Sequence, residues 1–293
     1  MALFDELQDL MIENRFRPEK KLSQFFCINE ALLYFIAKKI DLKKGDVVLE
    51  VGAGTGFFTK ILLNEAKKVG AKVVAIELDQ TMVNLLGKKF SKEIENKELE
   101  LILGDVLEAD LEKLGVTKIA SLPPYHISSA LVSKIILTNN LTRAILVLDK
   151  GFVDKMISFE GLVEYGALTA MVNLNSKVIV AEDSIAPQSF FPVPNCHSAV
   201  LQLDFNYKNN SKEYFVFLKE IFRHKNKDLQ KALKQSIGFL SKSIWWSERE
   251  VNLRIDSLKN AQKKVYLLSP QELLDVFEYL NTKNTKNIKQ KTK

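Results

Sequence analysis

Between Asp46 and Asp149, short apolar runs alternate with longer stretches of helical periodicity. The apolar runs are rich in valine and isoleucine and predict strands: DVVLEV (46–51), KVVAIE (72–77), LELILGD (99–105), KIASLP (118–123) and RAILVLD (143–149). The intervening segments are long enough for helices, at 57–67, 80–90 and 128–138. Strands that are apolar on both faces and separated by helices are typical of a parallel sheet covered on each side. The pattern therefore predicts an α/β, Rossmann-like domain.

After Gly161 the pattern changes. Three further stretches read as strands and predict an antiparallel edge of the sheet: ALTAMVNL (167–174), KVIVAE (177–182) and SAVLQLDF (198–205). From Lys212 onward the pattern is helical, at 213–225, 228–240, 247–260 and 269–280. Ser269 is the expected N-cap of the last helix, with Pro270 at its first position.

These patterns divide the chain into three parts. We expect a catalytic domain over 1–205, a small C-terminal helical domain over 206–281 and a basic tail over 282–293. The tail is expected to be disordered, because the last residues carry five lysines and no acid.

Composition supports a globular protein of two domains. The chain has 293 residues, of which 46% are hydrophobic and 27% charged. No apolar run is long enough for a spanning helix, and the acids Asp5, Glu6, Asp9 and Glu13 argue against a targeting peptide, so we expect a cytoplasmic protein. Its two cysteines, Cys27 and Cys196, have neither disulfide-framework nor zinc-site spacing, and no metal is expected.

The positive charge is concentrated in one part of the chain. The net charge is +6, but the chain from Asn206 onward has 19 Lys and Arg against 9 Asp and Glu, whereas residues 1–205 have 23 against 27. Such asymmetry favours a polyanionic partner, most often a nucleic acid, bound by the C-terminal part. A solvated lysine-rich surface is the alternative.

A glycine-rich loop follows the first predicted strand. It has the sequence Glu50-Val-Gly52-Ala-Gly54-Thr-Gly56 and leads into a helix. Glycines at alternate positions allow positive φ and let the backbone approach a ligand closely. The G-x-G-x-G spacing differs from the dinucleotide pattern G-x-G-x-x-G and favours S-adenosylmethionine, which has no pyrophosphate.

Two acids at later strand ends fit the same cofactor. Glu77 ends the second predicted strand, where a carboxylate can accept hydrogen bonds from both ribose hydroxyls. Asp105 ends the third, where it can accept a hydrogen bond from the adenine amino group. Together with the loop, these acids predict an S-adenosylmethionine site.

The segment after the fourth strand predicts methyl transfer to a planar amino group. It has the sequence Ser121-Leu122-Pro123-Pro124-Tyr125. The lone pair of such a nitrogen is delocalised into the base, so it attacks a methyl group only when acceptors hold its N–H groups and draw the lone pair out of plane. A backbone carbonyl before the proline and a nearby side-chain oxygen can supply those acceptors, while an aromatic ring stacks on the base.

At these positions the chain closely resembles the small-subunit ribosomal RNA adenine dimethyltransferase (KsgA-like) family, including its archaeal and eukaryotic relatives. The resemblance runs from about Arg17 to Leu233 and is carried by the following segments: Leu22-Ser23-Gln24-Phe25-Phe26, Glu50 to Gly56, Gly104-Asp105, Tyr165-Gly166-Ala167-Leu168, Phe190-Phe191-Pro192-Val193-Pro194 and Ser198-Ala199-Val200. The resemblance implies that Gln24 and Phe26 flank the cofactor and that Tyr125 and Phe190 sandwich the target adenine.

The catalytic motif departs from the family pattern Asn-(Leu/Ile)-Pro-Tyr. Ungapped alignment from Tyr125 places Leu122, which has no acceptor, at the asparagine position. Alternatively the extra proline is a local insertion and Ser121 supplies the oxygen. The other departures are Asp149-Lys150-Gly151 in place of Gln-Lys-Glu and Ser23 in place of glycine.

The expected function is dimethylation of adenine amino groups in small-subunit ribosomal RNA during ribosome biogenesis, with S-adenosylmethionine as the methyl donor. The expected partner is the small ribosomal subunit, bound by a monomeric protein that does not enter a membrane. One alternative is an assembly or RNA-binding factor that keeps the fold and has lost most catalysis. Another is a methyltransferase for a different amino substrate.

Overall fold

The computed structural model describes residues 2–18, 24–244, 247–259 and 261–281. Leu22 and Ser23 of the N-terminal signature and the expected tail over 282–293 lie outside the described residues. The chain divides into two compact units, 1–157 with 176–206 and 158–175 with 207–293. The chain passes between the units at 157/158, 175/176 and 206/207, and the last of these positions lies next to the expected domain boundary. Residues 158–175 form part of the C-terminal unit, which the sequence pattern did not indicate.

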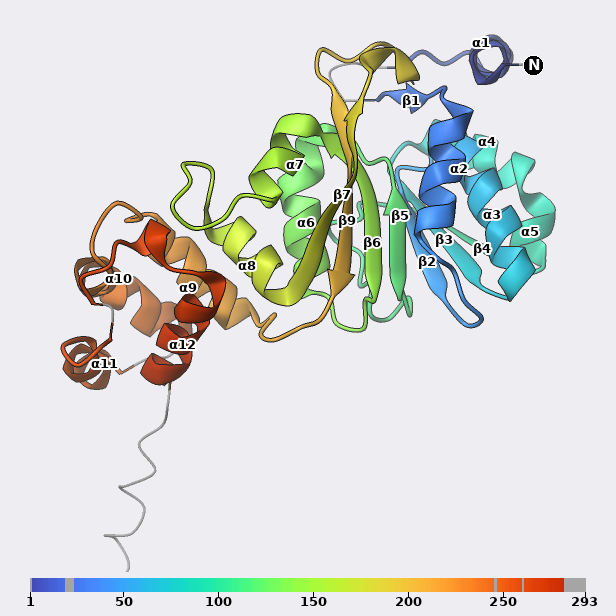
Figure 1. The fold of residues 1–293 in the computed structure, drawn as a ribbon. Coiled ribbons are helices and arrows are strands. Elements are labelled where there is room, and N and C mark those ends of the chain that lie inside the picture. Colours follow the sequence, from blue (N-terminus) through green and yellow to red (C-terminus); the bar gives the residue numbers. More distant parts are fainter. Residues whose placement is uncertain (1, 19–23, 245–246, 260, 282–293) are drawn as a thin grey trace, which may run out of the picture. The chain divides into compact units, whose positions relative to one another are not determined.

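The first unit is built on a seven-stranded sheet with the order β4-β3-β2-β5-β6-β9-β7 (Figure 1). Its strands are β2 (Val47–Val51), β3 (Lys72–Glu77), β4 (Leu99–Leu103), β5 (Lys118–Ser121), β6 (Arg143–Asp149), β7 (Ser176–Ile185) and β9 (Ser198–Phe205). The strands β4, β3, β2, β5 and β6 are parallel, and β9 runs antiparallel between β6 and β7. The predicted α/β, Rossmann-like fold is confirmed.

Helices flank this sheet and a small second sheet lies apart from it. The helices are α1 (Leu3–Glu13), α2 (Glu30–Lys39), α3 (Phe57–Val69), α4 (Gln80–Lys89), α5 (Ser91–Glu95), α6 (Ser128–Leu137) and α7 (Lys150–Met156). The second sheet pairs β1 (Phe26–Cys27) with β8 (Phe190–Phe191). Short 3-10 turns occur at Tyr125–Ile127 and Pro187–Ser189. The sequence pattern did not predict α1, α2 or the two-stranded sheet.

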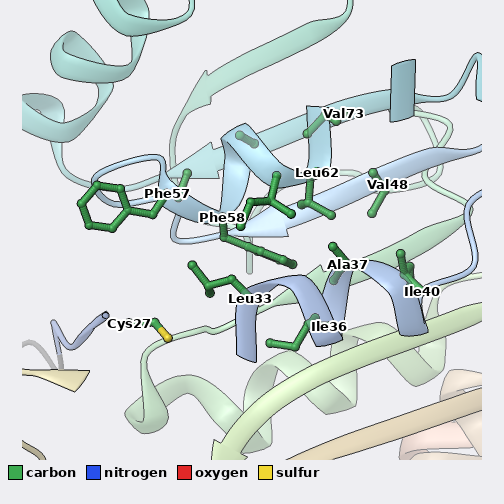
Figure 2. Close-up of a cluster of buried hydrophobic side chains, with 14 of the residues drawn as sticks. Cys27, Leu33, Ile36, Ala37, Ile40, Val48, Phe57, Phe58, Leu62 and Val73 are labelled. Carbon is green, nitrogen blue, oxygen red and sulfur yellow. The ribbon is translucent and has the colours of Figure 1, made fainter. Parts of the chain in front are cut away.

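The core beneath the glycine-rich loop joins α2 and α3 to β2. Figure 2 shows Phe58 and Leu62 of α3 lying against Leu33 and Ala37 of α2, and all four side chains are buried. Burial of such side chains removes apolar surface from water, which is the main stabilising contribution in a core of this kind. The start of α3 is therefore held in place where it follows the loop.

The second unit is helical. Its helices are α8 (Ala167–Asn175), α9 (Lys212–Phe222), α10 (Leu229–Ile244), α11 (Glu248–Ile255) and α12 (Pro270–Asn281), with a 3-10 turn at Val265–Leu267. Rings of Tyr214, Phe217 and Phe277 pack together between α9 and α12, with centroids 5.1–6.2 Å apart. The predicted small helical domain is present.

Two predictions at the ends of this unit have different outcomes. The predicted N-cap of α12 is confirmed, because Ser269 Oγ accepts from the Glu272 N–H and the Glu272 carboxylate accepts from the Ser269 N–H, which is a capping box. The predicted strand over 167–174 is wrong, since these residues lie in α8. The helix is buried on most of its surface, so its apolar residues show no helical periodicity. No helix in the described part of the chain is long and apolar enough to cross a membrane.

Candidate functional site

The predicted functional segments converge at the carboxyl ends of the parallel strands. The glycine-rich loop follows β2, Glu77 ends β3, and Leu122 to Tyr125 follow β5. The chain proceeds from β2 outward through β3 to β4 and then returns to β5 on the other side of β2. Ligands of open α/β sheets bind at such a reversal of strand order.

The glycine-rich loop needs its glycines for conformation and for space. Gly52, Gly54 and Gly56 have φ of 71°, 53° and 78°, in the left-handed region that favours glycine. A Cβ on Gly54 would lie 3.0 Å from the ring of Phe26, and one on Gly56 would lie 2.7 Å from the ring of Phe90. The loop therefore packs directly against these rings, and a larger residue at either position would displace it.

Glu77 links this loop to the end of β3. Its buried carboxylate accepts hydrogen bonds from the N–H groups of Gly54 (2.8 Å), Leu78 (2.9 Å) and Asp79 (3.0 Å). Each oxygen of a carboxylate can accept more than one hydrogen bond, so capacity remains for a ligand. Glu77 thus both shapes the loop and faces the hollow beside it.

Glu50 lies in the floor of the loop and is almost fully buried. Burial raises the pKa of Glu50 to about 8. The hydrogen bond from Thr59 Oγ1 at 2.6 Å opposes that rise, and the negative charge of Glu77 adds to it. Between pH 4.5 and pH 8, the folded protein therefore holds a proton that the unfolded chain has released.

We expect Glu50→Gln to change the pH dependence of stability. Because the folded-state pKa of Glu50 is raised, the wild type should lose stability as the pH rises from about 5 to about 8. Glutamine cannot ionise and keeps an oxygen for Thr59, so the variant should lose less stability over that interval. Denaturant unfolding of both proteins at about pH 5 and pH 8 measures this difference. Equal losses in the two proteins would contradict the protonated state of Glu50.

Two adjoining hollows bring together most of the predicted site residues. The first hollow is lined by predicted residues from several separate segments of the first unit: Gln24, Phe26, Glu50, Gly52, Gly54, Glu77, Leu122, Pro123, Pro124, Tyr125 and Phe190. The second shares Gln24, Gly52, Glu77 and Pro124 with the first and adds Asp105, which is exposed and accepts from the Leu107 N–H. Gly56 and Ser121 line neither hollow.

Ser121 is fully buried inside the sheet. Its hydroxyl donates to the Val51 carbonyl at 2.7 Å and accepts from the Val51 N–H at 3.2 Å. Both contacts join β5 to the end of β2 and commit the hydroxyl's only donor, and the buried side chain reaches neither hollow. The expectation that Ser121 supplies an acceptor to a substrate is therefore not supported by its position.

The residues after Ser121 face the first hollow. The Leu122 side chain is half-buried and lines that hollow, where it offers no hydrogen-bond acceptor. Pro123 lies just beyond the end of β5, and within the described residues its carbonyl oxygen accepts no hydrogen bond. Of the acceptors considered for this motif, the backbone carbonyl is the one that remains available.

Tyr125 is held by contacts at its hydroxyl and at one ring face. The hydroxyl lies 2.5 Å from Ser198 Oγ, and Ser198 is fully buried in β9. The ring stacks on that of Phe25, with centroids 5.7 Å apart and an interplanar angle of 30°. Burial raises the pKa of Tyr125 to about 12, an effect that the Ser198 contact partly offsets. The phenol is protonated at neutral pH, and its hydrogen bond with Ser198 holds the ring in place.

The two-stranded sheet joins the N-terminal signature to the later aromatic block. Phe26 is paired with Phe191, and Cys27 with Phe190. Phe190 is 2% exposed, so it lies in the wall of the first hollow. The stacked partner of Tyr125 in this structure is Phe25, whereas the resemblance implied a base held between Tyr125 and Phe190.

Gln24 and Lys89 contact residues at the edge of the site. Gln24 Nε2 donates to Asp79 Oδ2 at 3.4 Å, which ties the N-terminal signature to the start of α4. Lys89 Nζ donates to the Thr55 carbonyl in the loop at 3.1 Å and lies 3.6 Å from the Glu6 carboxylate in α1. Burial lowers the pKa of Lys89, and Glu6 partly offsets this effect. The sequence reasoning missed Lys89, and it gave no role to Phe25 or Ser198.

Comparisons with known proteins identify the family to which the chain belongs. A sequence profile of the ribosomal RNA adenine dimethylase family matches residues 15–281. The probable ribosomal RNA small subunit methyltransferase A of Thermococcus gammatolerans is 31% identical over 94% of each chain. The protein of the same description from Methanococcus maripaludis is 34% identical over 88% of this chain and 95% of its own.

Solved structures share the fold. A dimethyladenosine transferase from Plasmodium falciparum superposes with a TM-score of 0.70 at 25% identity, covering 86% of this chain and 95% of its own. The 23S rRNA methyltransferase ErmE superposes with a TM-score of 0.59 at 22% identity, covering 88% of this chain and 100% of its own, and it supports the fold alone.

Proposed function

The chain belongs to the ribosomal RNA adenine dimethylase family, and we propose that it transfers methyl groups from S-adenosylmethionine to adenine amino groups of small-subunit ribosomal RNA. The observation that carries this proposal is the meeting of the glycine-rich loop, Glu77 and the segment 122–125 around one hollow. A cofactor loop and an amino-group motif are thereby within reach of each other.

The residues around the loop fit the cofactor. Glycines with positive φ leave no side chain between the loop backbone and a ligand, and Glu77 offers a carboxylate at the position where ribose hydroxyls are bound in Rossmann-like folds. When bound, S-adenosylmethionine supplies a methyl group activated by its sulfonium sulfur. Asp105, in the second hollow, is the proposed acceptor for the adenine amino group of the cofactor.

The segment after β5 prepares the substrate nitrogen. The Pro123 carbonyl oxygen accepts a hydrogen bond from one N–H of the substrate amino group. This hydrogen bond draws the lone pair of the nitrogen out of the plane of the base. The apolar side chains of Leu122 and Phe190 line the first hollow, and a bound base that covers them strengthens this hydrogen bond by displacing water. No strong base is required, because the methylated nitrogen is cationic and loses its proton readily.

Tyr125 is the proposed stacking surface for the target adenine. Since Phe25 covers one face of its ring, a base that stacks on Tyr125 either uses the opposite face or displaces Phe25. Ser198 anchors the hydroxyl and acts as a positioning residue, because it fixes the ring without lining the hollow.

We expect Ser198→Ala and Tyr125→Phe to lower kcat/KM for the RNA by about 5- to 30-fold each, because either change removes the same buried hydrogen bond. For the same reason, the double variant should be little worse than either single variant. The affinity for S-adenosylmethionine should stay within about twofold of wild type. Additive losses in the double variant would show that the hydrogen bond is not the cause.

Methyl transfer from labelled S-adenosylmethionine to small-subunit particles tests the proposed function. The particles should come from cells that lack this protein, and the products should be separated into mono- and dimethyladenosine. We expect dimethyladenosine in small-subunit RNA. Labelling of another amino substrate, or RNA binding without transfer, would favour the alternative functions.

We also propose that the protein acts as a cytoplasmic monomer. The excess of lysine and arginine beyond Asn206 supports RNA contact by the C-terminal unit, and ribosomal RNA is the polyanion that fits.

A further inference from the structure

Two arginines near the N-terminus lack partners in the structure. Arg143, Arg223 and Arg254 donate to Asp204, to Glu220 and to backbone carbonyls at the end of α12. Among the described residues, Arg15 and Arg17, like Arg249 in α11, form no side-chain hydrogen bond or ion pair, and all three are exposed. Their guanidinium groups are free to bind an anion.

The backbone at Arg15 takes a conformation that favours glycine. The N–H groups of Arg15 and Phe16 donate to the carbonyls of Ile12 and Met11, which is the Schellman arrangement at the end of α1. Arg15 occupies the left-handed position of this motif with φ of 53°. A glycine would end the helix with less strain, so the turn itself does not require the arginine.

The two arginines border a shallow hollow with an apolar floor. It is lined by Gln8, Met11, Ile12, Arg15, Phe16 and Arg17, none of which is acidic, and the exposed Glu13 nearby in α1 does not line it. Ile12 is 76% exposed. A guanidinium group binds phosphate oxygens through paired N–H donors, and apolar side chains accommodate a ribose or a base. Such a surface fits one nucleotide of a single-stranded RNA segment.

This surface adjoins the proposed reaction site. The ring of Phe16 packs edge-on against that of Phe26, with centroids 6.0 Å apart, and Phe26 lines the first hollow. We infer that the surface formed by the residues lining this hollow binds the RNA backbone beside the target adenine, with Arg15 and Arg17 on its phosphates. This inference rests on the proposed function and adds an RNA-binding surface in the catalytic unit to the one expected beyond Asn206.

Salt-dependent binding tests the inference with full-length protein and deproteinised small-subunit RNA. The double variant Arg15→Gly/Arg17→Gln should bind about 5- to 30-fold more weakly, and its log-log salt slope should become less steep by about 0.7 for each phosphate that is no longer neutralised. Its melting temperature and S-adenosylmethionine affinity should not fall, because glycine suits the turn at position 15.

A control variant removes one exposed positive charge at the amino ends of the strands, on the side of the sheet away from the proposed site. Lys72→Gln lies at the amino end of β3 and should change neither the affinity nor the slope appreciably. Equal affinities and slopes in wild type and the double variant would overturn the inference, and so would an equal loss of affinity in Lys72→Gln. If the wild type transfers no methyl group, the proposed function fails, while the slopes still decide whether this surface binds RNA.

Discussion

Substitution of Glu77 by alanine is expected to weaken S-adenosylmethionine binding by about 10- to 150-fold, or roughly 1.5–3 kcal/mol. The Glu77 carboxylate is the proposed hydrogen-bond acceptor for the ribose hydroxyls. It also accepts hydrogen bonds from the N–H groups of Gly54, Leu78 and Asp79. The substitution therefore removes an acceptor for the ligand and releases the loop at Gly54. Isothermal calorimetry on the folded variant measures the effect.

Two further variants separate charge from position. Glu77→Gln should also bind weakly, because an amide nitrogen facing backbone N–H groups cannot accept from them. Glu100→Gln removes an exposed carboxylate from β4 and should leave the affinity unchanged. Wild-type affinity in Glu77→Gln would show that Glu77 does not hold the cofactor through its charge.

Substitution of Leu122 by asparagine is expected to raise the rate of methyl transfer by about 10- to 150-fold. Leu122 lines the first hollow beside Pro123, and its side chain supplies no acceptor. An asparagine oxygen there would accept the second N–H of the substrate nitrogen in the transition state, which is worth roughly 1.5–3 kcal/mol. Single-turnover transfer to small-subunit particles measures the rate without product release.

Controls distinguish an added acceptor from an altered shape. Leu122→Met keeps an apolar side chain of similar volume and should transfer at close to the wild-type rate. Ser121→Ala should lower stability by about 1–3 kcal/mol, because it removes both hydrogen bonds between the buried hydroxyl and the backbone of Val51. The rate per folded molecule should not change. A rate that Leu122→Asn leaves unchanged, or a rate abolished in Ser121→Ala, would contradict the proposed acceptor.

Local patterns were sufficient for the parallel part of the sheet. Segments such as 47–51 and 143–149 are apolar on both faces and lie between helices, so a few residues are enough to predict each strand. The same holds for the capping box at Ser269, whose partners are three residues apart. The pattern failed over 167–174, because a short helix buried on most sides has the same apolar run as a strand.

By itself, the sequence determined the parallel strands of the α/β region with the helices α3, α4 and α6, the order of the functional segments along the chain and the cofactor type, since these depend on residues near one another in sequence. Only the tertiary structure decided which side chains meet. Ser121 is committed to Val51, Tyr125 is anchored by Ser198, and the signature at Phe26 is paired with the block at Phe191. These contacts join residues 70 to 165 positions apart, and they depend on strand order and register, which no local pattern records.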